Sequence, residues 1–224
     1  MINIIFAMGE NGEFGRSLEL HKAIVARTPD EELRDLPKNG LPWHCRSDML
    51  FFRTMTNGIG SDVGMAAYQA LRGQFSQNTL HNVVAHAWAD DSEYNCVLSG
   101  VKTWQQMNLP MSRTRCFLPV SRSILKENGL NNLEELLDHT ANKGTSTVWI
   151  AGGKEFLMSV LDEFAAGKIH IDNMFVSTIK GTFESDVVID QAKLMMYIDS
   201  NFTYNEEYVE NKQVLIQRYR GVIK

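Results

Sequence analysis

The amino-acid sequence predicts an α/β protein whose central, mostly parallel β-sheet is flanked by helices. Three observations carry this prediction: short apolar runs recur along the chain, helical segments separate them, and two polar-alternating strands close the sequence. Of the 224 residues, 44% are hydrophobic and 22% are charged, which is typical of a globular protein with a substantial core. Because no internal repeat or low-complexity tract interrupts the chain, we expect a single domain over residues 1–224.

The expected strands are continuous apolar runs bounded by glycines or polar turns. They cover Ile2–Met8, Asn95–Gly100, Thr114–Ser121, the run that ends at Ile150, and Asn173–Ile179. Residues 202–220 alternate between apolar and polar side chains around a turn near Glu210 and Asn211. This alternation predicts a C-terminal antiparallel hairpin at the edge of the sheet.

Helices are expected between these strands. Residues 47–56 begin with Ser47 as the expected N-cap and carry Asp48 in the first turn. A short helix after Gly100 is expected to have Thr103 as its capping residue. A longer helix is expected after Gly152 and Gly153, since Phe156, Val160 and Phe164 repeat at a spacing of four.

Two segments, residues 16–40 and 57–94, interrupt this rhythm and are interpreted as insertions. In the first, 18–26 is expected to be helical, with Thr28 as the N-cap of a second helix. In the second, we expect a flexible linker (57–64), a helix (65–71) and a strand (82–88). An insertion of this size typically forms a small packing unit, a partner surface or an oligomer contact. The second is expected to be peripheral, because changes of loop length cost little.

Composition narrows the function classes. The formal net charge of -5 and the isoelectric point near 5.7 argue against nucleic-acid and membrane-surface binding, and favour small-molecule partners. The apolar runs are shorter than the roughly 20 residues that span a bilayer, and the N-terminus lacks a signal-peptide pattern, so a cytoplasmic location is expected. The three cysteines show no C-x-x-C spacing and the histidines are scattered, so we expect buried free thiols and no metal site.

Some residues have chemistry that the fold alone does not explain. Asp48 lies among Trp43 and large apolar side chains, and a carboxylate in such a place requires a partner. The turns at Gly100 and at Gly152–Gly153 each lead from a strand into a helix, where free N–H groups attract phosphate. Tight structural turns have the same pattern, so these glycines by themselves leave both interpretations open. No nucleophile-elbow sequence is present.

The order of the motifs is more specific than any one of them. The chain contains, in sequence, Phe14-Gly15, Leu41-Pro42-Trp43 with an acid five residues later, Gly100–Trp104, Leu109-Pro110 followed by an arginine, and Trp149–Phe156. Outside the two insertions, this order resembles the dihydrofolate reductase family along nearly the full chain. The resemblance implies a single-domain dihydrofolate-reductase-like fold in which residues 16–40 enlarge the lid loop beside the active site.

The resemblance also implies roles for particular residues. Asp48 would pair with the pterin ring, Trp43 would hold a water near it, and Ser177 would hydrogen-bond the acid. The implied substrate-binding residues are Ile5, Phe6, Met49, Phe52, Met107, Leu109, Arg113 and Ile150, with Arg113 gripping the glutamate carboxylate of folate. The implied cofactor-binding residues are Ala7, Phe14, Gly15, Leu41, Gly100, Val101, Lys102, Thr103, Ser121, Arg122, Ile150, Gly152, Gly153, Lys154, Glu155 and Phe156.

The implied reaction is hydride transfer from NADPH to 7,8-dihydrofolate, giving tetrahydrofolate for one-carbon and thymidylate metabolism. Val101 stands where many members have an arginine for the 2′-phosphate of NADPH, which leaves Lys102 and Arg122 to contact that group. One alternative is a reductase of the same fold that acts on another pterin or on a pyrimidine of riboflavin synthesis. Another is a non-catalytic binding or structural protein. For the dihydrofolate reductase as for these alternatives, residues 57–94 are a candidate contact for a protein partner or an oligomer.

Overall fold

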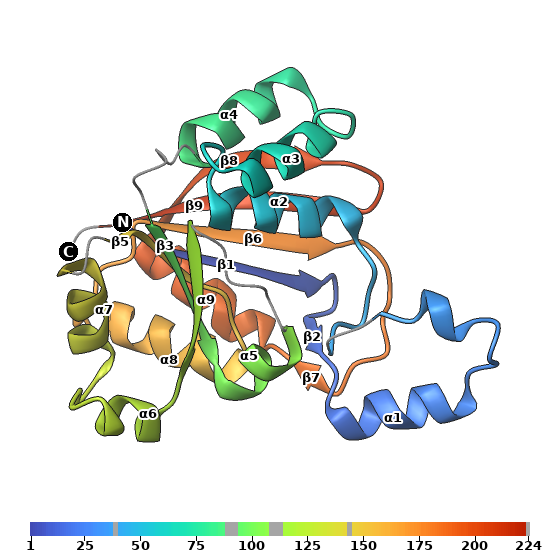
Figure 1. The fold of residues 1–224 in the computed structure, drawn as a ribbon, viewed down its shortest axis with the longest axis horizontal. Helices are drawn as coiled ribbons and strands as arrows, with labels where there is room; N and C mark the ends of the chain where they lie inside the picture. Colours follow the sequence, from blue (N-terminus) through green and yellow to red (C-terminus); the bar gives the residue numbers. More distant parts are fainter. Residues whose placement is uncertain (38–39, 88–93, 108–113, 143–144, 223–224) are drawn as a thin grey trace.

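The computed structural model describes residues 1–37, 40–87, 94–107, 114–142 and 145–222. Within this part of the chain, seven strands form one mixed sheet in the order β4-β3-β5-β1-β6-β9-β8 (Figure 1). The sheet consists of β1 (Ile2–Gly9), β3 (Tyr94–Gly100), β4 (Arg115–Val120), β5 (Thr145–Ile150), β6 (Asn173–Ile179), β8 (Phe202–Glu210) and β9 (Val214–Gly221). A two-stranded sheet pairs β2 (Glu13–Gly15) with β7 (Val187–Val188).

Strand directions confirm the predicted fold class. The strand β1 pairs in parallel with β5 and β6, and β3 pairs in parallel with β4 and β5. The last two strands, β8 and β9, form the predicted antiparallel hairpin, and β9 also pairs antiparallel with β6. Since the parallel strands share one direction, their carboxyl ends meet at one edge of the sheet, where ligands bind in α/β folds.

Helices cover both faces of the sheet, and each face has its own hydrophobic cluster. The larger cluster packs the sheet against α7, α8 and α9, and the smaller one packs it against α2 and α4. The helices are α1 (Leu18–Arg27), α2 (Arg46–Asn57), α3 (Asp62–Leu71), α4 (Gln77–Ala87), α5 (Val101–Met107), α6 (Arg122–Glu127), α7 (Leu133–Asn142), α8 (Lys154–Ala165) and α9 (Gln191–Asn201), with the 3-10 helix η1 (Leu33–Asp35).

The segment 57–94 differs from the prediction, because its described part forms two helices. Ser61 caps α3 by accepting a hydrogen bond from the Gly64 backbone N–H (3.0 Å), inside the segment that was expected to be a linker. The expected strand is wrong, since 82–87 belongs to α4, with Val83 and Ala87 buried four residues apart. A short apolar run is compatible with both strand and helix, and here tertiary packing selects the helix.

Three predicted helix caps are also wrong. Thr28 is the C-cap of α1, and only the three-residue η1 follows it. The helix α2 begins at Arg46, so Ser47 lies in its first turn and donates to Gln74 Oε1 (2.6 Å). Likewise α5 begins at Val101, which places Thr103 inside the helix. In each case the hydroxyl or backbone group has a different partner, so the residue type alone did not locate the helix end.

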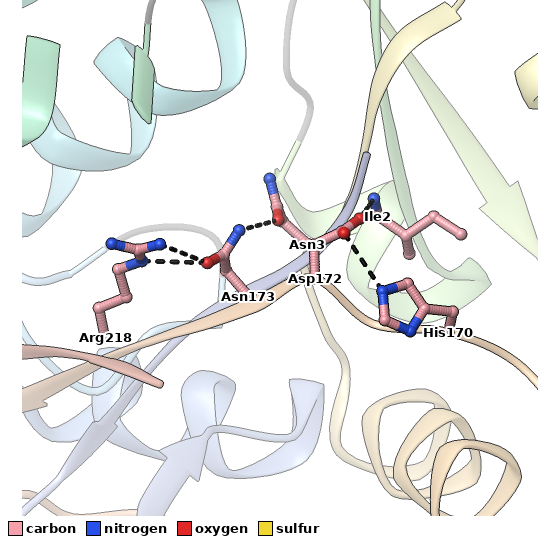
Figure 2. A network of polar contacts seen from close by, with 6 residues as sticks. All are labelled: Ile2, Asn3, His170, Asp172, Asn173 and Arg218. Atoms are coloured by element: carbon pink, nitrogen blue, oxygen red, sulfur yellow. Dashed lines mark hydrogen bonds and ion pairs between the residues drawn. The ribbon is translucent and has the colours of Figure 1, made fainter. Parts of the chain in front are cut away.

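A polar network fixes the amino-terminal edge of the sheet (Figure 2). The Asn3 side chain accepts a hydrogen bond from Asn173 Nδ2 (2.9 Å), and Asn173 Oδ1 accepts two from Arg218 (3.0 and 2.8 Å). Asp172 accepts from the Ile2 backbone N–H (2.7 Å) and contacts His170 Nε2 (3.2 Å). These contacts join the starts of β1 and β6 to β9, at the edge of the sheet opposite the carboxyl ends of β1 and β6. They hold the register of the three strands there.

None of the helices in the described ranges combines the length and the apolar character needed to cross a bilayer.

Candidate functional site

Asp48 lies against the carboxyl-terminal half of β6. Its carboxylate is hydrogen-bonded to the Ser177 side chain, and Ser177 pairs with Ala7 of β1 in the sheet register. Loss of solvent raises the pKa of Asp48 from its ordinary value of 3.8 to about 6, and the Ser177 hydrogen bond opposes this increase only in part. Because the Ser177 hydrogen bond offsets only part of the cost of removing this carboxylate from water, the site favours a ligand that donates hydrogen bonds or carries positive charge.

Trp43 adds a buried donor to this region. Its side chain is buried in the smaller cluster, and its ring meets Phe183 edge-on at a centroid distance of 5.3 Å. Its Nε1–H has no hydrogen-bond partner among the described residues. Buried indole N–H groups normally find a partner, so this donor is suited to a water or a ligand atom.

Apolar side chains from β1, α2, α5 and the loop before α2 border the same cluster. Leu41, Phe52 and Met107 are partly buried against it, as is Ala7. Met49, one turn from Phe52 on α2, is exposed. Together these residues give the α2 side of the sheet an apolar surface that is only partly covered, as the wall of a binding site requires.

The side chains of Phe6 and Ile150 lie on the other face of the sheet; the resemblance implied a side-chain contact for Ile150 and only a backbone contact for Phe6. Ile150 and Phe6 belong to the larger cluster against α8, whereas Ile5 belongs to the smaller one. Ile150 is fully buried, which corrects the expectation that its side chain forms a wall beside Met49 and Phe52. Successive side chains of a strand point to opposite faces of the sheet, which places the Ile150 side chain on the α8 side. Only the backbone of Ile150 is then available to a ligand in this site.

The two glycine turns come together at the carboxyl ends of β3 and β5. The Gly100 backbone N–H donates to Gly152 O (3.0 Å), and the Gly153 backbone N–H donates to Thr103 Oγ1 (3.0 Å). Gly152 has φ +107°, a conformation that favours glycine, and a Cβ on Gly153 would lie 2.5 Å from Thr103 Oγ1. The starts of α5 and α8 therefore lie side by side with their first backbone N–H groups at one edge.

Other predicted cofactor-binding residues surround these turns. A Cβ on Gly152 would approach the Phe14 ring at 3.6 Å, and one on Gly100 would approach Phe156 at 3.5 Å. Ser121 caps α6 directly after β4, whose Val120 is the register partner of Gly100. Val101 is partly buried, and Gly15 pairs with Val187 of β7. The remaining predicted cofactor-binding residues are exposed: Lys102, Arg122, Lys154 and Glu155.

Two predicted residues, Leu109 and Arg113, lie outside the described residues. In the described part of the chain, no group of three or more His, Cys, Asp and Glu side chains is arranged to hold a metal ion.

Two residues beside the site were not predicted from the sequence. Arg16 is buried, and it donates from Nη2 to Pro42 O (3.2 Å) and from Nε to Glu184 O (2.9 Å). Phe183 contacts Trp43 from a loop far along the sequence. Arg16 directly follows the Phe14-Gly15 motif, which was a usable signal, whereas nothing local distinguishes Phe183.

Comparison with known proteins supports the fold. No known family profile matches the sequence, and no curated protein matches it. Among solved structures, the chain is similar to a dihydrofolate reductase from Enterococcus faecalis complexed with NADP(H) and RAB-propyl. The TM-score is 0.52 at 16% sequence identity, and the match covers 99% of this chain and 96% of that one. The protein therefore has a dihydrofolate-reductase-like fold.

Proposed function

We propose that the protein is a dihydrofolate reductase that uses NADPH to reduce 7,8-dihydrofolate to tetrahydrofolate. The observation that carries the proposal is the Asp48 site: a desolvated carboxylate bonded to Ser177, with the unpartnered Trp43 N–H nearby in sequence. The order of the sequence motifs and the fold support it.

Asp48 suits the substrate because a pterin presents two neighbouring N–H donors on one ring edge. A carboxylate can accept both at once, and such a paired contact fixes orientation as well as affinity. With a pKa of about 6, Asp48 is mainly ionised at neutral pH, so its negative charge favours protonation of the bound ring. Trp43 would hold a water beside the acid, and Leu41, Phe52 and Met107 would pack on the rings.

The turns after β3 and β5 fit the pyrophosphate of a dinucleotide. The Gly100 and Gly153 N–H groups are bonded within the turns, and the glycines let the starts of α5 and α8 approach closely, which brings the first-turn N–H groups of both helices to one edge. Lys102 adds an exposed positive charge there. When bound, NADPH would supply the hydride that is transferred to the pterin. The protein's own contribution is to place the two rings, to limit water, and to hold Asp48 against the substrate.

Turnover of NADPH with dihydrofolate by the purified chain tests the proposal. We expect measurable turnover, and a fall of about 10²- to 10⁴-fold for Asp48→Asn, which keeps the shape and removes the charge. Asp62→Asn is the matched control, because Asp62 also lies in the first turn of a helix but belongs to α3. We expect partial rescue of Asp48→Asn at low pH, where more substrate is protonated before it binds.

The same assay separates the alternatives. Turnover with another pterin or with a riboflavin-pathway pyrimidine, and none with dihydrofolate, would assign the chain to a related reductase. Binding of NADPH without turnover of any of these substrates would favour a non-catalytic protein. A parental rate for Asp48→Asn would contradict the role of Asp48.

A further inference from the structure

Two of the three cysteines are direct neighbours across the β3–β4 pair. Cys96 and Cys116 are register partners in this parallel ladder, so their side chains leave the sheet on the same face. Both belong to the larger hydrophobic cluster, with exposed fractions of 1% and 9%. Both are free, and the two thiols are in hydrogen-bonding contact. Cys96 and Cys116 therefore form a buried dithiol. The third cysteine, Cys45, lies in the smaller cluster on the other face of the sheet.

The backbone spacing is compatible with a covalent bond between them. Neighbouring strands lie about 4.7–4.9 Å apart, and disulfides join Cα atoms separated by about 4.4–6.8 Å. Register partners on neighbouring strands therefore fall within the range for a disulfide, so a bond between Cys96 and Cys116 requires adjustment of side chains and little movement of the strands. In reducing compartments a disulfide of this kind is typically transient or redox-sensing rather than structural.

The two thiols are not equivalent. Cys116 lies on β4, an edge strand of the sheet, and Cys96 lies on the interior strand β3. The contact with Cys96 lowers the pKa of Cys116, and a hydrogen bond from Tyr94 lowers it further, although burial opposes both. The same contact raises the pKa of Cys96. Cys116 is therefore the better nucleophile, and Cys96 is placed to react second.

We propose that Cys96 and Cys116 form a reversible redox site, in which a peroxide converts the dithiol into a cross-strand disulfide. In the first step the Cys116 sulfur attacks one peroxide oxygen, the O–O bond breaks, and a sulfenic acid and water form. In the second, the Cys96 sulfur attacks the Cys116 sulfur and expels the oxygen as a second water. The two cysteines lose two electrons and two protons, which reduce the peroxide, and a thiol reductant reverses the reaction. The site is independent of the proposed reductase activity.

The test treats the folded protein with hydrogen peroxide, alkylates the remaining thiols in denaturant, and maps the peptides by mass. We expect a peptide pair joined through Cys96 and Cys116, with a mass lower by two hydrogen atoms, while Cys45 is alkylated. Dithiothreitol added before alkylation should restore three alkylated cysteines. Cys45→Ala is the matched control and should form the same bridge.

Variants of the pair identify the order of the steps. In Cys96→Ala, the Cys116 sulfenic acid has no partner and should be trapped by dimedone, whereas Cys116→Ala should give no trapped adduct. Three outcomes would overturn the proposal: a bridge that includes Cys45, stable sulfinic acid on Cys116 of the unchanged protein without a bridge, or three unmodified thiols after peroxide has oxidised free glutathione in the same solution.

Discussion

The two predicted insertions are attached to the molecule in different ways. The first (residues 16–40) carries α1, which projects away from the sheet, and the described part of the second (residues 57–87) lies over α2 (Figure 1). In the described part of the first, Arg16 and Ile24 are buried, and Ile24 joins neither large cluster. The second places Ile59, Val83 and Ala87 in the smaller cluster. The second is therefore part of the core, and the first is an attachment to it.

Polar contacts hold the first insertion at its base. The Arg16 backbone N–H donates to Gly40 O (2.7 Å), and the Ser17 backbone N–H donates to Asp186 Oδ1 (2.7 Å). An exposed ion pair joins Arg27 to Glu184. Exposed ion pairs contribute little to stability, so this insertion can change with little effect on the fold.

The second insertion corrects our expectation that residues 57–94 are peripheral. A hydrogen bond from the Ile59 backbone N–H to Ala87 O (2.7 Å) joins the start of this insertion to the end of α4. It also braces α2, the helix that carries Asp48, since Gln74 accepts a hydrogen bond from Ser47. Its removal would expose the outer side of α2, a role that no local sequence pattern indicates.

The largest expected difference between the insertions comes from matched valines. Val83 in α4 is 0% exposed and Val25 in α1 is 38% exposed. Val83→Asp places a charge in the cluster, and we expect a loss of several kcal/mol in unfolding free energy or failure to fold. Val25→Asp should change it by less than about 0.5 kcal/mol. Equal losses in a denaturant titration would show that both insertions are core elements.

A substitution at the turn after β3 separates cofactor binding from both insertions. Val101→Arg should increase the preference for NADPH over NADH, because it adds one charge-assisted bond to the 2′-phosphate, worth about 1.5–3 kcal/mol. The ratio of the two kcat/KM values measures this. Lys102→Ala and Arg122→Ala are the controls, and if neither alters the preference, the assigned phosphate pocket is incorrect.

The pH dependence of stability reports on Asp48 and on the helix that the second insertion braces. The folded-state pKa of about 6 lies above the ordinary 3.8, so the contribution of this group to stability falls as the pH rises from about 4 to about 6. Asp48→Asn should therefore be more stable than the parent protein at pH 7. Because the Asp48 side chain is partly exposed, solvent screens part of the cost of its charge, and we expect a gain of about 1–2 kcal/mol. This advantage should vanish near pH 4. Denaturant titrations at both pH values measure it, and lower stability at pH 7 would indicate a structural cap.

The smallest expected effect is on the fold when most of the first insertion is removed. Replacing residues 18–36 with a short Gly/Ser linker should change the unfolding free energy by about 1 kcal/mol or less, because the segment buries few apolar side chains. Thermal unfolding measures this. A protein that no longer unfolds cooperatively would place α1 among the core elements.

The sequence by itself determined the sheet and the order of the motifs. Strands with both faces buried read as continuous apolar runs, so β1, β3, β4, β5 and β6 were predictable from local composition. The glycines at 100, 152 and 153 were predictable as turns because each joins a strand to a helix. Asp48 stood out because a lone carboxylate among apolar residues requires an explanation.

Only the tertiary structure decided how these pieces meet. The contact of Asp48 with Ser177 and that of Trp43 with Phe183 each join positions more than a hundred residues apart, and no local pattern encodes them. The face on which Ile150 lies depends on strand register, and the helix at 82–87 depends on packing over α2 and β8. Local sequence fixes backbone preference, but a side chain's burial and its pKa follow from neighbours that only the folded chain brings together.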